Sequence, residues 1–346
     1  MTRPEPRPAG ARPITIRDVA REAGVSVASA SRALNGLDSV TAQMRERVLG
    51  AAQHLRYFPH TAARALSTRR TDTIGLVLPD LHGEFFSEVI RGADLAARAR
   101  GLHLLVSTSH GDKYEAAAAI RSMRGRVDGL MLMSPYVDED VLADNLADDL
   151  PTVLISSRIE GRPNAAFCVD NHAGAMAAVK HLTACGGAVA HIAGPANNFE
   201  SEERRRGYRD ALGGVEDLVM QGDFSEESGY RAGLRLAEMK DRPRAVFAAN
   251  DMMAIGCLLA LAERGVRVPA DIAVAGFDDV PVARLIRPSL TTVRTAIADL
   301  SRRAAERLVA VIAGEDIADQ LVETTLPRLV VRESSAGNSN AAGNAA

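Results

Sequence analysis

Residues 15–35 read TIRDVAREAGVSVASASRALN, and this stretch decides the architecture of the N-terminal part of the chain. Apolar side chains recur there at helical spacing and are interrupted at Gly24-Val25-Ser26, which predicts two short helices joined by a tight turn. Thr15 and Ser26 stand where a hydroxyl can accept a backbone N–H from the first turn of each helix. The apolar positions that we expect to face inward are Val19, Ala20, Ala23, Val25, Ala30 and Leu34.

The same pattern leaves four side chains pointing outward at the beginning of the second helix: Val27, Ala28, Ser29 and Arg32. In a helix-turn-helix these positions enter the DNA major groove, where an arginine can bond both O6 and N7 of guanine and short apolar side chains can contact a thymine methyl. A helical hairpin with a solvated polar face would produce a similar pattern. A third helical pattern ends near Tyr57 and completes a small all-helical unit.

Charge divides the chain in the same place. Residues 1–70 carry 12 arginines and 5 acidic residues, a net charge of +7, whereas residues 71–346 carry 29 basic and 39 acidic residues, a net charge of −10. A basic segment attached to an acidic body is typical of a nucleic-acid-binding head, although an arginine-rich surface tail could mimic it.

From Thr15 to Asn35 the chain matches, residue for residue, the motif T-I-x-D-V-A-x-x-A-G-V-S-x-x-x-x-S-R-x-L-N, and it thereby resembles the DNA-binding head of the LacI/GalR family. The resemblance implies that Arg32 reads guanine, that Val27 and Ala28 select neighbouring bases, and that the polar side chains face the sugar-phosphate backbone. The DNA-contacting residues that it implies are Thr15, Val27, Ala28, Ser29, Ser31, Arg32, Asn35 and Leu66.

Residues 57–66, YFPHTAARAL, are similar to the family's hinge, in which a proline starts a helix of about two turns. So short a helix is marginal in isolation, and we expect it to order only on paired DNA, with Leu66 wedged into the minor groove. The alternative is an ordinary linker with a buried leucine.

Beyond residue 73 the pattern changes to short apolar runs that alternate with amphipathic segments: IGLVLP, HLLVST, DGLMLMS, TVLISS, AVAHIAG, RAVFAAN and DIAVAGF. Such runs predict parallel sheets covered on both faces, and there are too many for one ordinary sheet. Several are followed directly by polar residues: Asp80, Ser134, Ser156, Asn250, Asp251 and Asp278. Because ligands of open α/β sheets lie outside the carboxyl ends of the strands, we expect these polar groups to line one cleft. The number of strands predicts two similar subdomains that face each other across it.

The family resemblance continues through the rest of the chain, for example at Arg126–Gly129, Gly276–Asp279 and Pro288–Val293. It implies an α/β body like that of periplasmic sugar-binding proteins, with two Rossmann-like subdomains joined by three crossing strands. The effector-binding residues that it implies are Phe85, Phe86, Ser134, Ser156, Asn198, Glu200, Arg204, Phe224, Asn250 and Asp278. Ser156 departs from the aspartate of many members, and Asn198 and Glu200 follow no close precedent, so the effector's identity stays open. Asp170 and Asp251 are expected to brace loops or subdomains.

We therefore expect this division of the chain: a disordered tail (1–13), a helix-turn-helix domain (14–58), a hinge helix with linker (59–71), an effector-binding and dimerisation domain (72–333) and a second disordered tail (334–346). Within the large domain, the expected N subdomain is about 72–170 plus 296–325, and the C subdomain is about 171–295 plus 326–333.

Other patterns are missing from the sequence. It contains no apolar run long enough to span a membrane, no secretory signal core, and no G-x-G-x-x-G after the first strand, G-x-x-x-x-G-K-S/T, G-x-S-x-G or H-E-x-x-H motif. We expect a cytoplasmic protein without enzymatic activity, cofactor or metal, and consider an enzyme or a transport-type sugar receptor the rival interpretations. The three cysteines, Cys168, Cys185 and Cys257, and the histidines His103 and His191 are expected to be core residues.

The sequence thus predicts a transcriptional regulator, a repressor, that binds a pseudo-palindromic operator as a homodimer and responds to a sugar or sugar derivative. It leaves open the operator sequence and target genes, whether the effector induces or co-represses, and whether dimers assemble into tetramers.

Overall fold

The structure, a computed structural model, describes residues 12, 14–36, 39–57, 70–136, 139–159, 164–214, 217–315 and 322–336. The chain divides into two compact units, Met1–Thr71 and Asp72–Ala346. The hinge prediction, including Leu66, lies outside the described residues.

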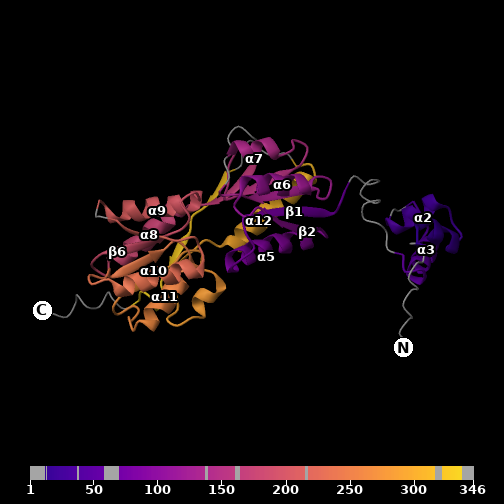
Figure 1. The fold of residues 1–346 in the computed structure, drawn as a ribbon. Coiled ribbons are helices and arrows are strands. Elements are labelled where there is room, and N and C mark those ends of the chain that lie inside the picture. Colours follow the sequence, from indigo (N-terminus) through magenta and orange to yellow (C-terminus); the bar gives the residue numbers. More distant parts are fainter. Residues whose placement is uncertain are drawn as a thin grey trace, which may run out of the picture. The chain divides into compact units, whose positions relative to one another are not determined.

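The N-terminal unit contains three helices, α1 (Ile16–Glu22), α2 (Val27–Leu34) and α3 (Ala42–His54), shown in indigo in Figure 1. Val19, Ala30 and Val48, one from each helix, are fully buried and form the centre of its core. The predicted all-helical head is confirmed.

Local hydrogen bonds define where α1 and α2 begin. The Ser26 hydroxyl accepts the backbone N–H of Ser29 at 3.1 Å, as predicted for an N-cap. At α1 the Asp18 carboxylate accepts both the backbone N–H and the hydroxyl of Thr15, at 3.0 and 2.8 Å, and these bonds lower the pKa of Asp18 to about 2. Between the helices Gly24 has a φ of 65°, which glycine adopts without strain and which the tight turn needs.

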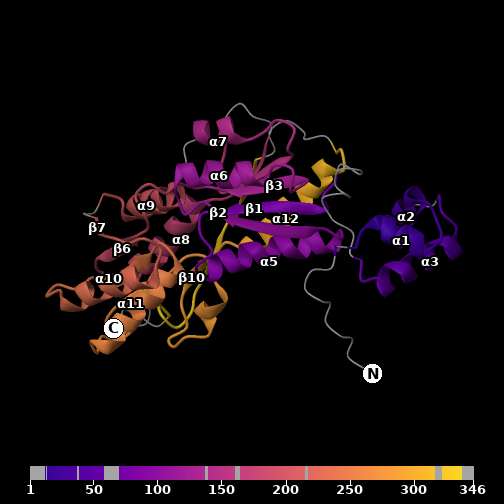
Figure 2. The ribbon, with the colours of Figure 1, turned by 45° about the vertical axis from the view of Figure 1, so that its right-hand side comes forward.

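The first half of the body is built on a six-stranded parallel sheet with the order β11-β5-β4-β3-β1-β2. Its strands are β1 (Thr73–Leu78), β2 (His103–Thr108), β3 (Gly129–Met133), β4 (Thr152–Ile155), β5 (Ala165–Val169) and β11 (Val322–Thr325). Two helices, α5 (Glu84–Ala99) and α12 (Ile297–Ile312), cover one face. On the other face lie α6 (Lys113–Met123) and α7 (Glu139–Asn145), and Figure 2 shows α5 and α6 on opposite sides of β1.

The second half has a four-stranded parallel sheet with the order β7-β6-β8-β9. Its strands are β6 (Val189–Ala193), β7 (Leu218–Gln221), β8 (Ala245–Ala248) and β9 (Ala273–Ala275). One face packs against α8 (Asn171–Thr183) and α9 (Phe199–Leu212), and the other against α10 (Glu226–Glu238) and α11 (Asp251–Glu263). A short 3-10 helix, η1 (Pro281–Arg284), follows β9.

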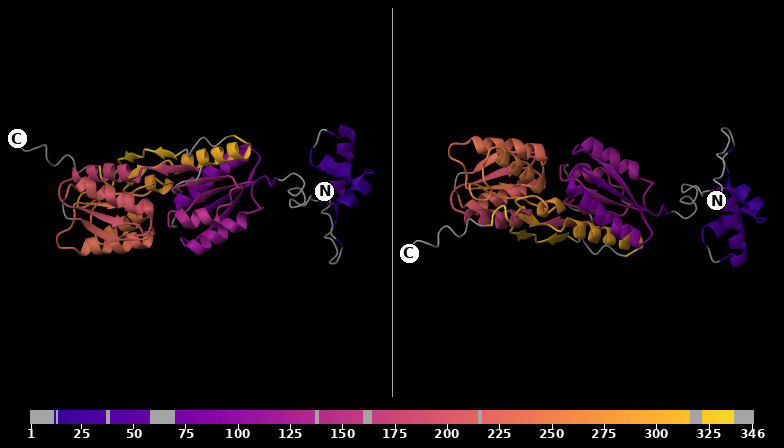
Figure 3. Two further views of the ribbon diagram at one scale, coloured as in Figure 1. Left: turned by 90° about the horizontal axis from the view of Figure 1, so that it is seen from above. Right: turned by 90° about the horizontal axis from the view of Figure 1, so that it is seen from below.

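The chain passes between the two halves three times, after β5, after β10 (Thr292–Arg294) and between β11 and β12 (Arg328–Val330). β10 and β12 pair antiparallel beside the crossings. In Figure 3 the yellow C-terminal segment runs along both halves of the body. Gly92 of α5 lets α12 approach, because a Cβ at that position would lie 2.1 Å from the carbonyl oxygen of Ala298. The predicted fold class is confirmed.

The sequence patterns missed five strands that the structure contains: β5, β7, β10, β11 and β12. β7, β11 and β12 are partly exposed and therefore lack the continuous apolar run that identifies a buried strand. β10 has only three residues, and β5 is itself an apolar run of five residues that the pattern could have found. His103 is exposed, contrary to the prediction, because β2 is an edge strand of its sheet. Cys257 is buried as predicted, whereas Cys168 and Cys185 are only partly buried.

Candidate nucleic-acid interface and ligand cleft

The residues that were predicted to contact DNA lie on the accessible side of α2 and beside it. Val27 is 44% exposed, and Ala28 and Arg32 are also exposed. Ala28, Arg32 and Asn35 follow one another at helical spacing and therefore share a face. Thr15, Ser29, Ser31 and Asn35 are partly exposed.

Local contacts hold these side chains. The Nε of Arg32 donates to the carbonyl oxygen of Ala28 at 3.3 Å, and the Ser26 and Ser29 hydroxyls are 2.9 Å apart. The side-chain amide of Asn35 donates to the Ser31 hydroxyl at 3.4 Å. An accessible helix start with one arginine, two short apolar side chains and several hydroxyls has the composition that reads base edges and phosphates.

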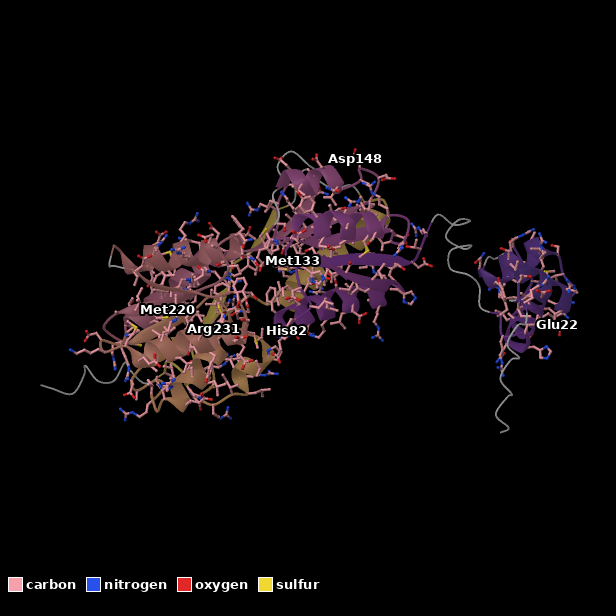
Figure 4. The ribbon with its side chains drawn as sticks, in the orientation of Figure 1. Glu22, His82, Met133, Asp148, Met220 and Arg231 are labelled. Atoms are coloured by element: carbon pink, nitrogen blue, oxygen red, sulfur yellow. The ribbon has the colours of Figure 1, made fainter. Side chains whose placement is uncertain are left out.

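A cavity of about 470 Å³ lies between the two halves of the body, outside the carboxyl ends of their strands. Figure 4 shows His82 and Met133, two of its lining residues, where the halves face each other. Eight of the ten residues predicted for the effector site line it: Phe85, Phe86, Asn198, Glu200, Arg204, Phe224, Asn250 and Asp278. Its volume falls within the range of small-molecule sites.

Arg204 of α9 occupies the buried floor of the cavity. Its Nε donates to the side-chain oxygen of Asn171 at 2.8 Å, and its Nη1 donates to the carbonyl oxygen of Ala249 at 2.5 Å. Nη2 lies 3.4 Å from Oδ1 of Asp278, and the guanidinium carbon lies 3.9 Å from the ring centre of Phe277. The side chain is therefore fixed from several directions before any ligand enters.

Asp278 is the acidic partner of this pair and is 7% exposed. Its φ of 111° is a strained conformation for a side-chain-bearing residue, of a kind that is concentrated at functional sites. Its Oδ1 has no hydrogen-bond partner among the described residues. Burial raises the pKa of Asp278 to about 7, opposed by the Arg204 guanidinium and reinforced by Glu200. A carboxyl group of this kind can accept bonds from ligand hydroxyls.

The two amides that line the cavity also cap helices. The Asn198 oxygen accepts the N–H of Ser201 at the start of α9, at 2.9 Å. The Asn250 oxygen accepts the N–H of Met253 at 2.9 Å, and its NH₂ group donates to the carbonyl oxygen of Phe224 at 3.0 Å. Their positions are therefore set by the backbone of the second half.

Aromatic rings form the apolar walls. Phe85 and Phe86, at the start of α5, pack edge to face with ring centres 5.4 Å apart. Opposite them, Phe224 has a φ of 71°, and its ring covers Gly194 so closely that a Cβ there would lie 2.4 Å from a ring carbon. Flat apolar surfaces beside fixed polar groups suit a ring-shaped hydroxylated ligand.

Two predicted residues, Ser134 and Ser156, are not among the cavity's lining residues. Both are buried, and neither hydroxyl has a hydrogen-bond partner among the described residues. Ser156 has a φ of 52°, so the chain turns sharply as β4 ends. The rule that polar residues after parallel strands line a cleft does not hold at these two positions.

Asp80, which the strand-end rule assigned to the cleft, lines the cavity as predicted. Sequence reasoning missed other residues that line it: His82, His110, Tyr136, Asp223, Glu226 and Met252. His110 and Tyr136 come shortly after β2 and β3, so the same strand-end rule could have found them.

Asp170 and Asp251 serve the backbone. The Asp170 carboxylate caps α8 by accepting the N–H of Ala173 at 2.9 Å. The Asp251 carboxylate accepts the Thr292 hydroxyl at 2.5 Å and the N–H of Val280 at 2.9 Å, so it ties α11 to the segments on either side of η1.

Within the described ranges, no group of three or more His, Cys, Asp or Glu side chains is arranged to hold a metal ion. Across those same ranges, every helix is too short or too polar to span a bilayer.

Comparison with known proteins decides the family. Residues 15–60 match the model of bacterial regulatory proteins of the lacI family, and residues 187–335 match a periplasmic binding protein-like domain. The HTH-type transcriptional regulator GalS of Salmonella typhimurium is 35% identical over 337 residues, which cover 95% of this chain and 98% of GalS. The chain belongs to the lacI family of bacterial regulatory proteins.

Two solved structures extend the comparison. The lac repressor dimer bound to operator and the anti-inducer ONPF has a TM-score of 0.82 and 27% identity, over 94% of this chain and 99% of that one. The complex of the transcriptional regulator CelR with cellobiose has a TM-score of 0.68 and 34% identity, over 93% of this chain and all of that one. The predicted family is confirmed, and this lacI-family chain is a transcriptional regulator with a helix-turn-helix head and a periplasmic-binding-like body.

Proposed function

We propose that the chain is a repressor that binds a pseudo-palindromic operator as a homodimer and that a sugar-like effector in the cleft controls its affinity for DNA. The observation that carries this proposal is the joint presence of an accessible α2 surface and a cleft with a fixed Arg204–Asp278 pair. The relatives add support, since one was solved as a dimer on operator DNA and another with cellobiose.

On the DNA side, we propose that Arg32 reads guanine, that Val27 and Ala28 contact neighbouring bases, and that Thr15, Ser29, Ser31 and Asn35 position the helix on the backbone. Leu66 is proposed as the minor-groove wedge of the hinge. One reading helix covers only a few base pairs, so a two-fold symmetric protein on a two-fold symmetric site supplies the length that specificity needs.

On the effector side, we propose that Arg204 and Asp278 are the main polar anchors and that the phenylalanines cover a ring face. Ser134 and Ser156 could contribute only if closure of the cleft exposed them. A ligand that binds better to one arrangement of the two halves shifts the population towards it, and DNA must then change ligand affinity by the same factor, typically about 5–150-fold.

Arg32→Ala tests the DNA-reading assignment on an operator selected from random duplexes. We expect it to lose about 1–3 kcal/mol of the preference for operator over random DNA and to keep weak, salt-sensitive binding. Arg47→Ala is the matched control, because Arg47 is also an exposed arginine of the head but lies on α3. An unchanged operator preference in Arg32→Ala would exclude Arg32 as a base-reading residue.

Asp278→Ala tests the effector assignment. We expect operator binding to persist and the response to ligand to disappear, because Asp278 belongs to the unit that does not contain α2. Undiminished ligand affinity in a calorimetric titration of this variant would contradict the assignment.

A binding role also accounts for the buried carboxyl group of Asp278 without invoking catalysis, and several relatives are named as transcriptional regulators or repressors. We accordingly propose that the chain is not an enzyme and that, as a regulator of chromosomal DNA, it works in the cytoplasm.

A further inference from the structure

We propose that the cleft selects an uncharged sugar of at least two rings and rejects sugars that carry a phosphate or carboxylate group. This inference rests on the proposed function of the cleft as the effector site and names the class of ligand that the site takes.

The charge of the cavity lining is the first argument. Five carboxyl groups line it. Among the described lining residues, Arg204 is the only lysine or arginine. Three of the carboxylates are exposed at the rim: Asp80, Asp223 and Glu226. A cleft lined by one sign of charge repels ligands of the same sign and concentrates neutral or opposite ones.

The second argument is that the Arg204 guanidinium already has partners within the protein. Its guanidinium already donates to Asn171 and Ala249 and faces Asp278, and its plane lies against Phe277. A phosphate is normally recognised by an arginine that can offer two parallel N–H groups, and here the carboxylate of Asp278 stands beside the group that would have to do so. A phosphate bound to the Arg204 guanidinium would therefore lie beside the Asp278 carboxyl group, and ionised Asp278 would repel it.

The polar groups that remain are suited to hydroxyls. Asp278 lines the cavity, and its buried Oδ1 makes no hydrogen bond among the described residues besides its ion pair with Arg204. Tyr136 and the rim side chains His82 and His110 provide further polar contacts at a distance from the buried floor. A hydroxyl can donate to a carboxylate and accept from an imidazole or phenol. An uncharged polyol can therefore bond both to Asp278 at the floor and to the histidine and tyrosine side chains of the cavity.

The size of the cavity is the third argument. A water molecule takes roughly 30 Å³ in the liquid, so 470 Å³ corresponds to roughly 16 positions, compared with roughly 12 non-hydrogen atoms in one hexose. One ring would therefore leave part of the cavity to water. Two rings can extend from the buried floor to the exposed rim. A ligand of that length would have most of its surface buried, as ligands in small-molecule sites do.

Thermal-shift and calorimetric titrations of the full chain test this inference with matched sugars. The probes are glucose and galactose, their 6-phosphates, glucuronate and galacturonate, and the two-ring sugars cellobiose, lactose, maltose and melibiose. We expect at least one two-ring sugar to bind at least about tenfold more tightly than its component hexoses, and each charged derivative to bind at least about tenfold more weakly than its parent. A 6-phosphate or uronate that binds as tightly as its parent, or the absence of binding by every two-ring sugar, would overturn the inference.

A rim variant tests whether charge is the cause. The double variant Asp223→Asn, Glu226→Gln keeps the size and hydrogen-bonding groups of two exposed side chains, so we expect it to fold and to narrow the ratio of uncharged to phosphorylated sugar affinity roughly three- to tenfold. Asp241→Asn removes an exposed carboxylate just before β8, at the opposite end of that strand from Asn250, and should leave the ratio unchanged. An unchanged ratio in the rim variant would contradict the electrostatic argument.

The same probes in an operator-binding assay separate this inference from the proposed function. A phosphorylated sugar that binds and alters operator affinity would overturn the charge selectivity and leave the proposed function intact. An uncharged two-ring sugar that binds without any effect on operator affinity would overturn the proposed function and leave the charge selectivity intact.

Discussion

Replacement of Asp278 by asparagine is expected to change how the stability of the body depends on pH. Asp278 is almost fully buried and its carboxyl pKa is raised to about 7 by burial, from 3.8 for an exposed aspartate. Between these two values the folded state holds a proton that the unfolded chain has lost. The unfolding free energy must therefore fall as the pH rises from about 4 to about 7 and level off above it.

The size of the effect follows from the two pKa values. Each unit of difference corresponds to about 1.4 kcal/mol, and linkage between pH 5 and pH 8 then removes about 2–3 kcal/mol from the unfolding free energy of the wild type. Asparagine cannot titrate, so Asp278→Asn should lose this slope. Burial and the charge of Asp278 also raise the pKa of Asp251. Removal of that charge should therefore lower the pKa of Asp251 and reduce the pH dependence of the unfolding free energy further.

Urea unfolding at pH 5, 6, 7 and 8, followed by far-UV circular dichroism without ligand, measures the slopes. Asp241→Asn is the control, because it replaces an exposed side chain and should leave the slope of the protein equal to that of the wild type. Equal slopes for Asp278→Asn and wild type between pH 5 and 8 would refute the assignment of a protonated Asp278 near neutrality. The absolute stability of the variant is not the criterion, since Arg204 loses its acidic partner at the same time.

Three further outcomes can be measured. Affinity for a hydroxylated ligand should fall as the pH drops below about 7, by at most about tenfold per unit, because ligand hydroxyls donate to ionised Asp278; calorimetry showing constant affinity between pH 6 and 8 would argue against this contact. Gly194→Ala should displace the Phe224 ring, destabilise the body by about 1–3 kcal/mol and weaken ligand binding while operator binding persists; ligand affinity equal to that of the wild type would show that the wall is not needed. Leu66→Ala should reduce operator affinity and DNA bending in gel-shift assays without changing ligand affinity, and equal bending at saturation would exclude Leu66 as the wedge.

Much of the fold could be predicted because its signals are local. The helices of the head follow from apolar spacing, the Ser26 cap and the glycine turn, all of which act within a few residues. Fully buried strands such as β3 and β8 appear as continuous apolar runs, since both of their faces are covered. Partly exposed strands such as β11 lack such a run, and their existence depends on a neighbour that lies far away in sequence.

Some residues of the candidate cleft could be predicted because the carboxyl ends of parallel strands meet at one edge of a sheet. Residues such as Asn250 and Asp278 follow strands of one sheet, and parallel strands bring their carboxyl ends to the same edge. The rule does not describe the local path of the backbone after each strand. Ser134 and Ser156 therefore remain outside the cavity lining, although they too follow strands.

The sequence by itself determined the helix-turn-helix and the alternation of strands and helices, because periodicity, caps and turns are properties of neighbouring residues. The family resemblance implied eight of the residues that line the cleft. Only the tertiary structure decided that Arg204 faces Asp278, that Asn171 and Ala249 occupy its remaining donors, and that acidic side chains collect at the rim. These groups come from different strands and helices of the body. Their distances depend on how its elements pack, and those distances decide which charges are neutralised and which remain to select a ligand.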